Sequence, residues 1–186
     1  MSIETRSPDL TQALSSICSN ADLANYCEIL DIRESQLIEP ILDIGAGMKN
    51  RFANSLRSRK HKNTFAVNPQ LVLDDRRKKL RRNKAPITAA LAQALPFRDE
   101  SFNTIISLYA VPMHLRNDDV EVVFSEIYRL LKPGGQAYLC PLTKMDYDLI
   151  TQTDLMDRYH CKVEVASYVR VKDQYIRLFR ARIFKR

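Results

Sequence analysis

The residues that most clearly suggest chemistry are two glycines, Gly45 and Gly47, which follow a short apolar run. Residues 40–44 read Pro-Ile-Leu-Asp-Ile, a pattern typical of a strand buried on both faces of a parallel sheet. Glycine has no Cβ atom, so the backbone at these two positions can turn sharply and approach a ligand closely. A helical pattern follows, and a helix N-terminus presents unpaired N–H groups to whatever lies in the turn. Strand, turn and helix together predict the first unit of a nucleotide-binding α/β domain.

Basic residues are concentrated in one region of the chain, whose net charge is +7. Residues 49–84 hold thirteen basic and two acidic residues, whereas residues 1–48 hold two basic and eight acidic ones. The densest basic run could bind nucleic acid or an acidic protein. It lacks interleaved aromatic residues for base stacking, so a solvated helix face is the alternative interpretation. The run consists of Arg76, Arg77, Lys78, Lys79, Arg81 and Arg82.

Length and composition exclude several classes of protein. The 186 residues fit one domain that can bury a core of its own. The four cysteines lie far apart without a C-x-x-C pair, which favours reduced thiols over a metal site or a disulfide framework. No apolar run is long enough to span a membrane, and the first 30 residues do not resemble a secretion signal. We therefore expect a cytoplasmic protein with no metal and no membrane contact.

The order of the predicted elements indicates an α/β fold. Residues 1–39 look helical, with start signals at Ser7-Pro8 and near Asp22, and we expect them to cover part of the sheet. Residues 40–186 alternate strands with helices, which predicts one compact domain with a mostly parallel sheet. Strands are expected at 40–44, 64–69, 86–90, 102–109 and 136–142, and helices at 50–60, 70–83, 118–131 and 146–159. Residues 163–171 and 175–184 predict a final antiparallel hairpin.

Three motifs occur along this chain in a fixed order. The first is ILDIGAG at 41–47, and the second is ALPF at 94–97 followed by ESFNTIIS at 100–107. The third, EIYRLLKPGG at 126–135, combines a helix with a proline–glycine turn. Together they resemble the motifs of class I S-adenosylmethionine-dependent methyltransferases, especially the broad small-molecule-type group. The resemblance covers residues 40–142 and implies a Rossmann-like seven-stranded, mostly parallel sheet with helices on both faces and a C-terminal antiparallel hairpin.

The resemblance also implies that S-adenosylmethionine is the cofactor and that it lies across the ends of the first, second and fourth strands. On that basis Gly45 and Gly47 lie against its methionine and ribose parts, and Asn68 occupies the place of a ribose-binding acid. The implied cofactor-binding residues are Asp43, Gly45, Ala46, Gly47, Lys49, Asn68, Pro69, Leu91, Ala92, Gln93 and Leu108.

Three of these positions differ from the pattern of the family. Lys49 replaces a third glycine, Asn68 the ribose acid and Leu91 an aspartate that usually binds the adenine amino group. A carboxylate can accept from both ribose hydroxyls, and its loss costs about 1–3 kcal/mol. Leu91 could instead pack on the adenine face. The sequence therefore predicts either methyl transfer to an unidentified acceptor or a non-catalytic binding or regulatory module of the same fold. It leaves the oligomeric state open.

Two residues near the end of the fourth predicted strand are candidates for catalysis. Methyl transfer is an in-line displacement that needs positioning and a dry cleft, and an oxygen acceptor would also need a base. His114 could take a proton near neutral pH, with a surface loop histidine as the alternative. Tyr109 could contact the acceptor or pack at the strand end. Cys140 fits a small buried hydrophobe better than a nucleophile.

Overall fold

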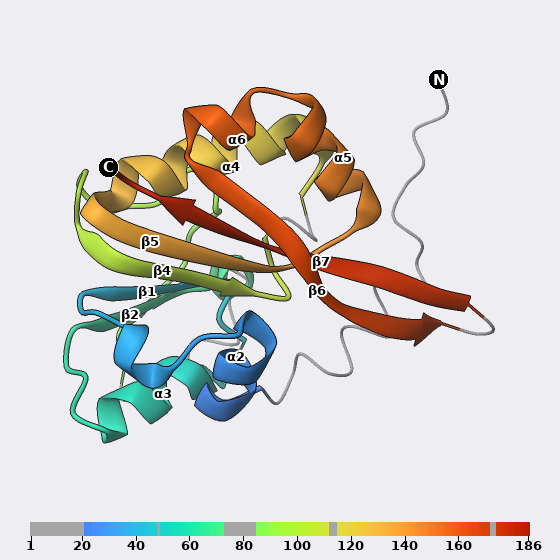
Figure 1. The fold of residues 1–186 in the computed structure, drawn as a ribbon. Helices are drawn as coiled ribbons and strands as arrows, with labels where there is room; N and C mark the ends of the chain where they lie inside the picture. The colour runs from blue at the N-terminus through green and yellow to red at the C-terminus, as the bar shows by residue number, and fades with distance from the viewer. Residues whose placement is uncertain (1–20, 48, 73–84, 112–114, 172–173) are drawn as a thin grey trace.

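One seven-stranded sheet forms the centre of the protein, as the ribbon in Figure 1 shows. The computed structural model describes residues 21–47, 49–72, 85–111, 115–171 and 174–186. Within these residues the strand order is β3-β2-β1-β4-β5-β7-β6. The strands are β1 (Ile41–Ile44), β2 (Thr64–Val67), β3 (Ile87–Thr88), β4 (Phe102–Leu108), β5 (Leu131–Leu142), β6 (Cys161–Val171) and β7 (Gln174–Phe184).

The strand directions confirm the predicted topology. β1 pairs in parallel with β2 and β4, β2 with β3, and β4 with β5, whereas β7 runs antiparallel to both β5 and β6. The central register aligns Asp43 of β1 with Ala66 of β2 and Ile106 of β4. Parallel strands end at the same edge of a sheet, so the residues that follow β1, β2 and β4 are brought together there.

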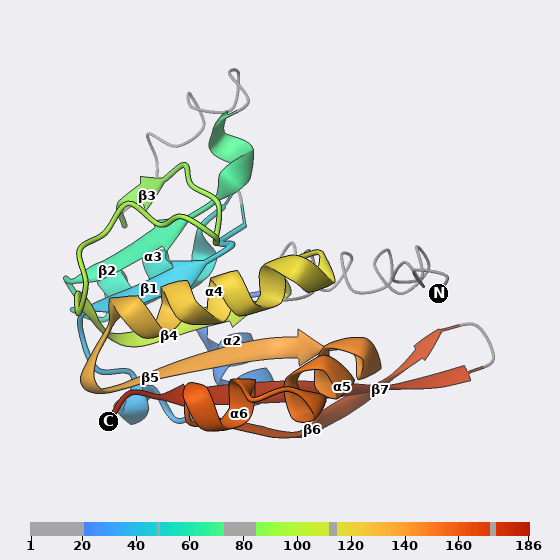
Figure 2. The ribbon, with the colours of Figure 1, turned by 90° about the horizontal axis from the view of Figure 1, so that it is seen from above.

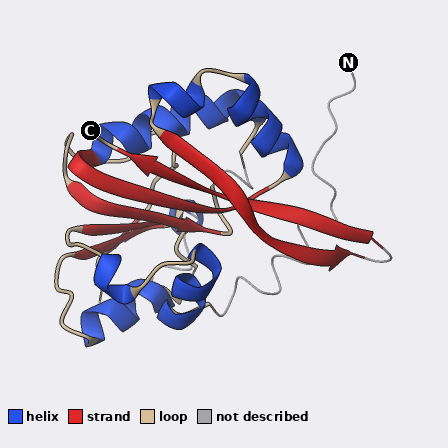
Figure 3. Cartoon of the chain, viewed as in Figure 1, coloured by secondary structure: helices blue, strands red, loops and turns tan. Residues whose placement is uncertain are grey.

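Helices cover both faces of the sheet (Figures 2 and 3). One face carries α2 (Leu23–Leu30) and α3 (Arg51–Ser58), and the other carries α4 (Asn117–Leu130), α5 (Lys144–Gln152) and α6 (Leu155–Arg158). Two 3₁₀ turns, η1 (Glu34–Gln36) and η2 (Pro69–Val72), complete the described elements. Each face has its own core cluster, which includes Phe124 of α4 on one face and Phe52 of α3 on the other. No described helix has the length and apolar character needed to cross a membrane.

The N-terminal cover begins where the sequence predicts a helix start. The Asp22 side chain accepts hydrogen bonds from the N–H groups of Ala24 and Asn25, and the Asn25 side chain accepts one from the Asp22 N–H. This reciprocal cap fixes the start of α2, which buries Leu23 and Tyr26 beneath it. The predicted start at Ser7 lies outside the described residues and stays a prediction.

Local structure departs from the sequence-based expectations in several places. The helical segment expected to reach residue 39 ends at Leu30, and only the 3₁₀ turn Glu34–Gln36 lies between α2 and β1. The helix expected at 146–159 is split into α5 and α6, and the Thr153 hydroxyl at the end of α5 donates to the Leu149 carbonyl. The turn expected at 132–135 belongs to β5, which begins directly after α4 and carries a register shift opposite residues 102–104. Gly135 tolerates this crowding because a Cβ there would lie 2.8 Å from the Lys132 carbonyl oxygen. Most of the helix expected at 70–83 lies outside the described residues.

Candidate functional site

A pocket of about 160 Å³ opens at the carboxyl ends of β1, β2 and β4. Ile44 and Gly45 at the end of β1 form one side of the pocket, and Val67 and Pro69 at the end of β2 form another. The other lining residues come from the segment after β3 and the segment after β4: Ala90, Leu91, Ala92, Gln93, Ala110, Val111 and Leu115. Apolar side chains dominate this lining and Gln93 adds an amide, which suits a flat ring with a polar edge.

The two glycines of the first turn have different structural roles. Gly45 has φ +82°, and a Cβ built there would lie 2.1 Å from the Cβ of Ala110. The N–H groups of Gly45 and Ala46 both donate to the Val67 carbonyl oxygen, at 2.8 and 3.0 Å. A Cβ on Gly47, by contrast, would meet no atom of the described residues within 4 Å, its chain neighbours aside. The fold therefore requires Gly45, whereas Gly47 leaves open space in which a ligand can approach the backbone.

Ser107 is a buried polar residue that shapes the segment after β4. Its hydroxyl donates to the Ile44 carbonyl at 3.0 Å and accepts from the Val111 N–H at 2.9 Å. Tyr109 then adopts φ +59°, and its N–H donates to the Cys140 carbonyl at 2.7 Å. The Val111 contact holds the segment against the pocket. The sequence signal for this role, a serine within an apolar strand, was overlooked.

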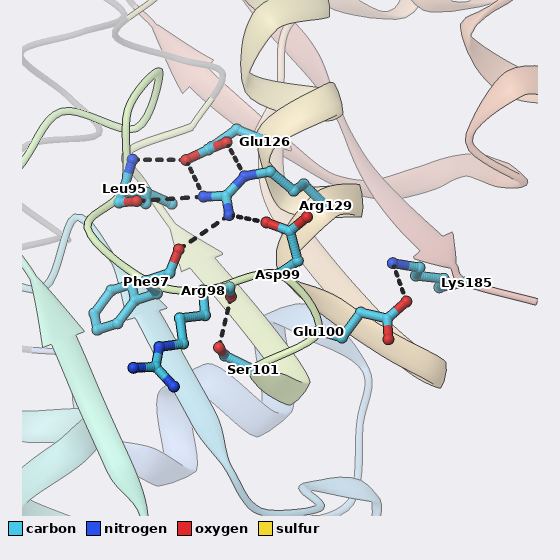
Figure 4. Close-up of polar contacts among 9 residues, drawn as sticks. All are labelled: Leu95, Phe97, Arg98, Asp99, Glu100, Ser101, Glu126, Arg129 and Lys185. Carbon is cyan, nitrogen blue, oxygen red and sulfur yellow. Dashed lines mark hydrogen bonds and ion pairs between the residues drawn. The ribbon is translucent and has the colours of Figure 1, made fainter.

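An arginine on α4 holds the segment that leads away from the pocket wall (Figure 4). Arg129 donates to the carbonyls of Leu95 and Phe97, at 3.3 and 3.0 Å, and to the Asp99 carboxylate at 2.6 Å. Glu126 accepts from Arg129 and from the Leu95 N–H, each at 2.7 Å. The hydrogen bond from Arg129 holds the pKa of Glu126 below its usual range. These contacts join the second sequence motif to the third and hold residues 95–99, which follow the pocket-lining segment 90–93 along the chain.

A buried carboxyl group lies on the opposite face of the sheet from the pocket. Asp43 is 1% exposed, and the Tyr26 hydroxyl of α2 lies 3.4 Å from each of its oxygens. Tyr26 is itself fixed by stacking on Phe52, with ring centroids 4.2 Å apart. Burial raises the pKa of Asp43 to about 7, and the Tyr26 hydrogen bond acts in the opposite direction. The neutral, protonated form of Asp43 therefore persists to a higher pH than that of an exposed aspartate.

The structure places some of the expected cofactor residues at the pocket and others away from it. Five expected residues line it: Gly45, Pro69, Leu91, Ala92 and Gln93. The others, namely Asp43, Ala46, Gly47, Lys49, Asn68 and Leu108, are not among its lining residues. Asn68 is buried and its N–H donates to the Thr88 carbonyl, while Leu108 packs in the core cluster beneath α2.

Several further lining residues were not anticipated: Ile44, Val67, Ala90, Ala110, Val111 and Leu115. Most of them are neighbours of expected residues. The sequence therefore indicated the segments that form the pocket more accurately than the individual side chains that line it. Tyr109 is 8% exposed and packs with Leu108. His114 and the basic run 76–82 lie outside the described residues. In the part of the chain that is described, no group of three or more His, Cys, Asp or Glu side chains could hold a metal.

Solved methyltransferases share this fold. A S-adenosylmethionine-dependent methyltransferase from Methanosarcina mazei superposes with a TM-score of 0.57 at 17% identity, covering 78% of this chain and 91% of that one. Phosphoethanolamine N-methyltransferase 2 of Haemonchus contortus, solved with S-adenosyl-L-methionine, gives 0.59 at 16% identity over 98% of this chain and 58% of that one. The architecture is therefore that of the class I methyltransferases.

Sequence comparison identifies the family to which the chain belongs. Residues 42–139, slightly more than half of the chain, match the protein family described as "Methyltransferase domain", so the chain belongs to that family. A stretch of 60 residues is 40% identical to a demethylmenaquinone methyltransferase of Streptomyces griseus. That match covers 32% of this chain and 24% of the relative, so the similarity spans about a quarter of the relative's length.

Proposed function

We propose that this protein binds S-adenosylmethionine at the pocket and transfers its methyl group to an acceptor. The observation that carries the proposal is the position of an apolar pocket at the ends of β1, β2 and β4, in a chain of the methyltransferase family. When bound, S-adenosylmethionine would supply a methyl group on a positively charged sulfur. The acceptor would attack the methyl carbon in line, and the sulfur would leave as part of S-adenosylhomocysteine. The protein mainly has to position the reactants and exclude water.

The residues present fit the adenine end of this cofactor. The pocket volume of about 160 Å³ is below the ~300 Å³ at which whole-ligand pockets usually begin, so it takes a nucleobase and leaves the remainder outside. Leu91 and Pro69 would pack on the ring faces, and the Gln93 amide would bind its polar edge. The open space beside Gly47 would receive the ribose and methionine parts. Val111 and Leu115 would keep water from the inner end of the pocket.

Isothermal titration of the full chain with S-adenosylmethionine and S-adenosylhomocysteine tests the proposal. We expect binding of both, with adenosine as a weaker competitor. Absence of heat or of a thermal shift with either ligand at millimolar concentration would overturn it. The relative from Streptomyces griseus makes demethylmenaquinone the first acceptor to assay for methyl incorporation.

A second candidate, a non-catalytic binding or regulatory module, is favoured by the small pocket volume and by the replaced anchors Asn68 and Leu91. The exposed position of Leu91, 59% accessible, allows a substitution that leaves the fold intact. Under this hypothesis Leu91→Asp raises S-adenosylhomocysteine affinity sharply from almost none, because it adds an acceptor for the adenine amino group. Micromolar binding by the native chain would exclude the hypothesis.

A further inference from the structure

A second and larger groove lies between α5 and the β6–β7 hairpin. Its volume is about 580 Å³, which falls within the range usual for small-molecule sites, about 300–1,000 Å³. The hairpin extends past the other strands, and α5 lies beside it (Figure 1). None of the groove's lining residues lines the pocket at β1, β2 and β4. The groove is therefore separate from the proposed cofactor site.

The floor of the groove is aromatic and apolar. Tyr147 of α5 stacks on Phe179 of β7, with ring centroids 4.4 Å apart and planes 24° from parallel. Val163 and Val165 of β6 border this pair, and Val165 is 43% exposed although it is apolar. Flat apolar surfaces of this kind favour a planar aromatic ligand, which can pack on the side chains without ordering many rotatable bonds.

The charged groups around the groove favour an anion. Lys144 and Arg177 supply cations, and the Lys144 ammonium lies 4.9 Å from the centre of the Tyr147 ring. Lys144 forms an exposed ion pair with Asp148, but an ammonium has three donors and can bind a second anion. The acidic lining residue, Glu164, pairs with two arginines of β7, Arg180 at 2.8 Å and Arg182 at 3.3 Å. Asp31 pairs with the same two arginines, so these four charges cancel.

We propose that this groove is a binding site for a planar aromatic ligand that carries an acidic group. The ring packs over Tyr147 and against Val165, and the acidic group is bound by Lys144 and Arg177. A guanidinium has five N–H donors and can bind a carboxylate through two parallel hydrogen bonds, so Arg177 can take such a ligand in addition to its contacts within the protein. This site goes beyond methyl transfer and does not depend on it.

Titration of the full chain with 2-naphthoate tests the proposal, with neutral 2-naphthamide as the matched probe. Methyl resonances of Val163 and Val165 report binding in the groove, and calorimetry gives the affinity. We expect 2-naphthoate to shift both valines and to bind about tenfold more tightly than 2-naphthamide, because its charge engages the two cations. Equal affinity for the two probes would overturn the proposal. So would the absence of any shift of these valines at about 10 mM 2-naphthoate, a concentration above the ~1 mM dissociation constant of a weak complex.

Variants distinguish binding in the groove from general electrostatic attraction to the protein surface. Lys144→Gln and Arg177→Gln should each weaken 2-naphthoate binding severalfold, and Val165→Asp should abolish it by placing a like charge at the floor. Lys162→Gln is the control, because Lys162 is exposed on β6 but does not line the groove. Thermal unfolding of each variant verifies folding, and Lys144→Gln carries the test if Arg177→Gln is unstable. If Lys162→Gln weakens binding as much as Lys144→Gln does, the site is refuted. S-adenosylhomocysteine titration of the same samples reports independently on the proposed cofactor site.

Discussion

The two glycines of the first turn allow the requirements of the fold to be separated from those of a ligand. Gly45→Ala places a Cβ 2.1 Å from the Ala110 Cβ, at a residue whose φ is +82°. Gly47→Ala places a Cβ where, within the part of the chain that the structure describes, only its chain neighbours come within 4 Å. The two substitutions are chemically identical and two residues apart. We expect the first to act on stability and the second on ligand affinity.

The structure sets the size of the first effect. An alanine held in the left-handed region costs about 1–2 kcal/mol. Overpacking against Ala110 adds about 1–3 kcal/mol, so the free energy of unfolding of Gly45→Ala should fall by about 2–5 kcal/mol. For a chain of this length that corresponds to a melting temperature lower by about 5–20 °C. Gly47→Ala should stay within about 1 kcal/mol of the wild type.

Thermal unfolding followed by circular dichroism measures these differences, and calorimetry with S-adenosylhomocysteine measures the affinity. We expect Gly47→Ala to melt like the wild type but to bind at least about tenfold more weakly, because its Cβ occupies the space through which the ligand reaches the backbone. Adding Ala110→Gly to Gly45→Ala should recover about 1–3 kcal/mol, since it removes the clash but not the backbone strain.

Three results would refute this reasoning. The first is a Gly45→Ala variant that melts with the wild type, which would mean that the turn relaxes freely around the new Cβ. The second is a Gly47→Ala variant that keeps full affinity, which would mean that no ligand approaches this glycine. The third is a double variant without recovery, which would show that Ala110 is not the obstructing group.

Four further predictions concern the carboxyl group under α2, the arginine on α4 and the basic run. Because burial raises the pKa of Asp43 to about 7, the native state binds one proton more than the unfolded chain between about pH 4 and pH 7. This group's contribution to the free energy of unfolding therefore falls with rising pH across that window, by on the order of 4 kcal/mol. Urea denaturation at pH 5 and pH 8 measures this fall, and Asp43→Asn should remove the part of the pH dependence that comes from this group. Tyr26→Phe removes the donor that opposes the shift, so carboxyl-carbon NMR should show a still higher pKa for Asp43; an unchanged value would contradict the assigned hydrogen bond. Arg129→Ala should lower the free energy of unfolding by about 2–3 kcal/mol, against less than about 1 kcal/mol for the exposed Arg158→Ala, and equal losses would disprove the special role of Arg129. If residues 76–82 bind RNA, affinity should fall steeply with salt and on replacing residues 76–79 by alanine; binding indifferent to both would exclude that interaction.

The positions of the first, second and fourth strands along the chain could be predicted because their ends carry strong local signals. Glycines end β1, a proline follows β2, and the predicted fourth strand differs from β4 by one residue. The split between α5 and α6 depends on the hydrogen bond from the Thr153 hydroxyl to the Leu149 carbonyl, which the hydrophobic periodicity of the sequence does not predict. The early start of β5 depends on Gly135 fitting under neighbouring carbonyls, which is a tertiary contact.

The candidate site was predicted at the level of segments because the side chains of a strand alternate between two faces. Ile44 lines the pocket and belongs to the cluster under α4, whereas its neighbour Asp43 bonds to Tyr26 of α2. Leu108 likewise packs under α2. The motif identifies the strand end without identifying the face on which the pocket opens. Ala110 and Val111 could not be predicted at all, because their positions depend on the hydrogen bonds of Ser107.

The same distinction decides how much the first motif says about ligand binding. Gly45 would be needed in any protein with this turn, because Ala110 packs where its side chain would be and φ is positive. A chain that had lost its ligand but kept its fold would therefore still retain Gly45. Gly47 has no such constraint, since a Cβ there would not touch any of the described residues beyond its chain neighbours. Gly45 lines the proposed cofactor pocket but is also required by the fold, so its substitution affects stability whether or not a ligand binds. Gly47 is exposed, so its substitution tests the proposed cofactor site with little effect on the fold.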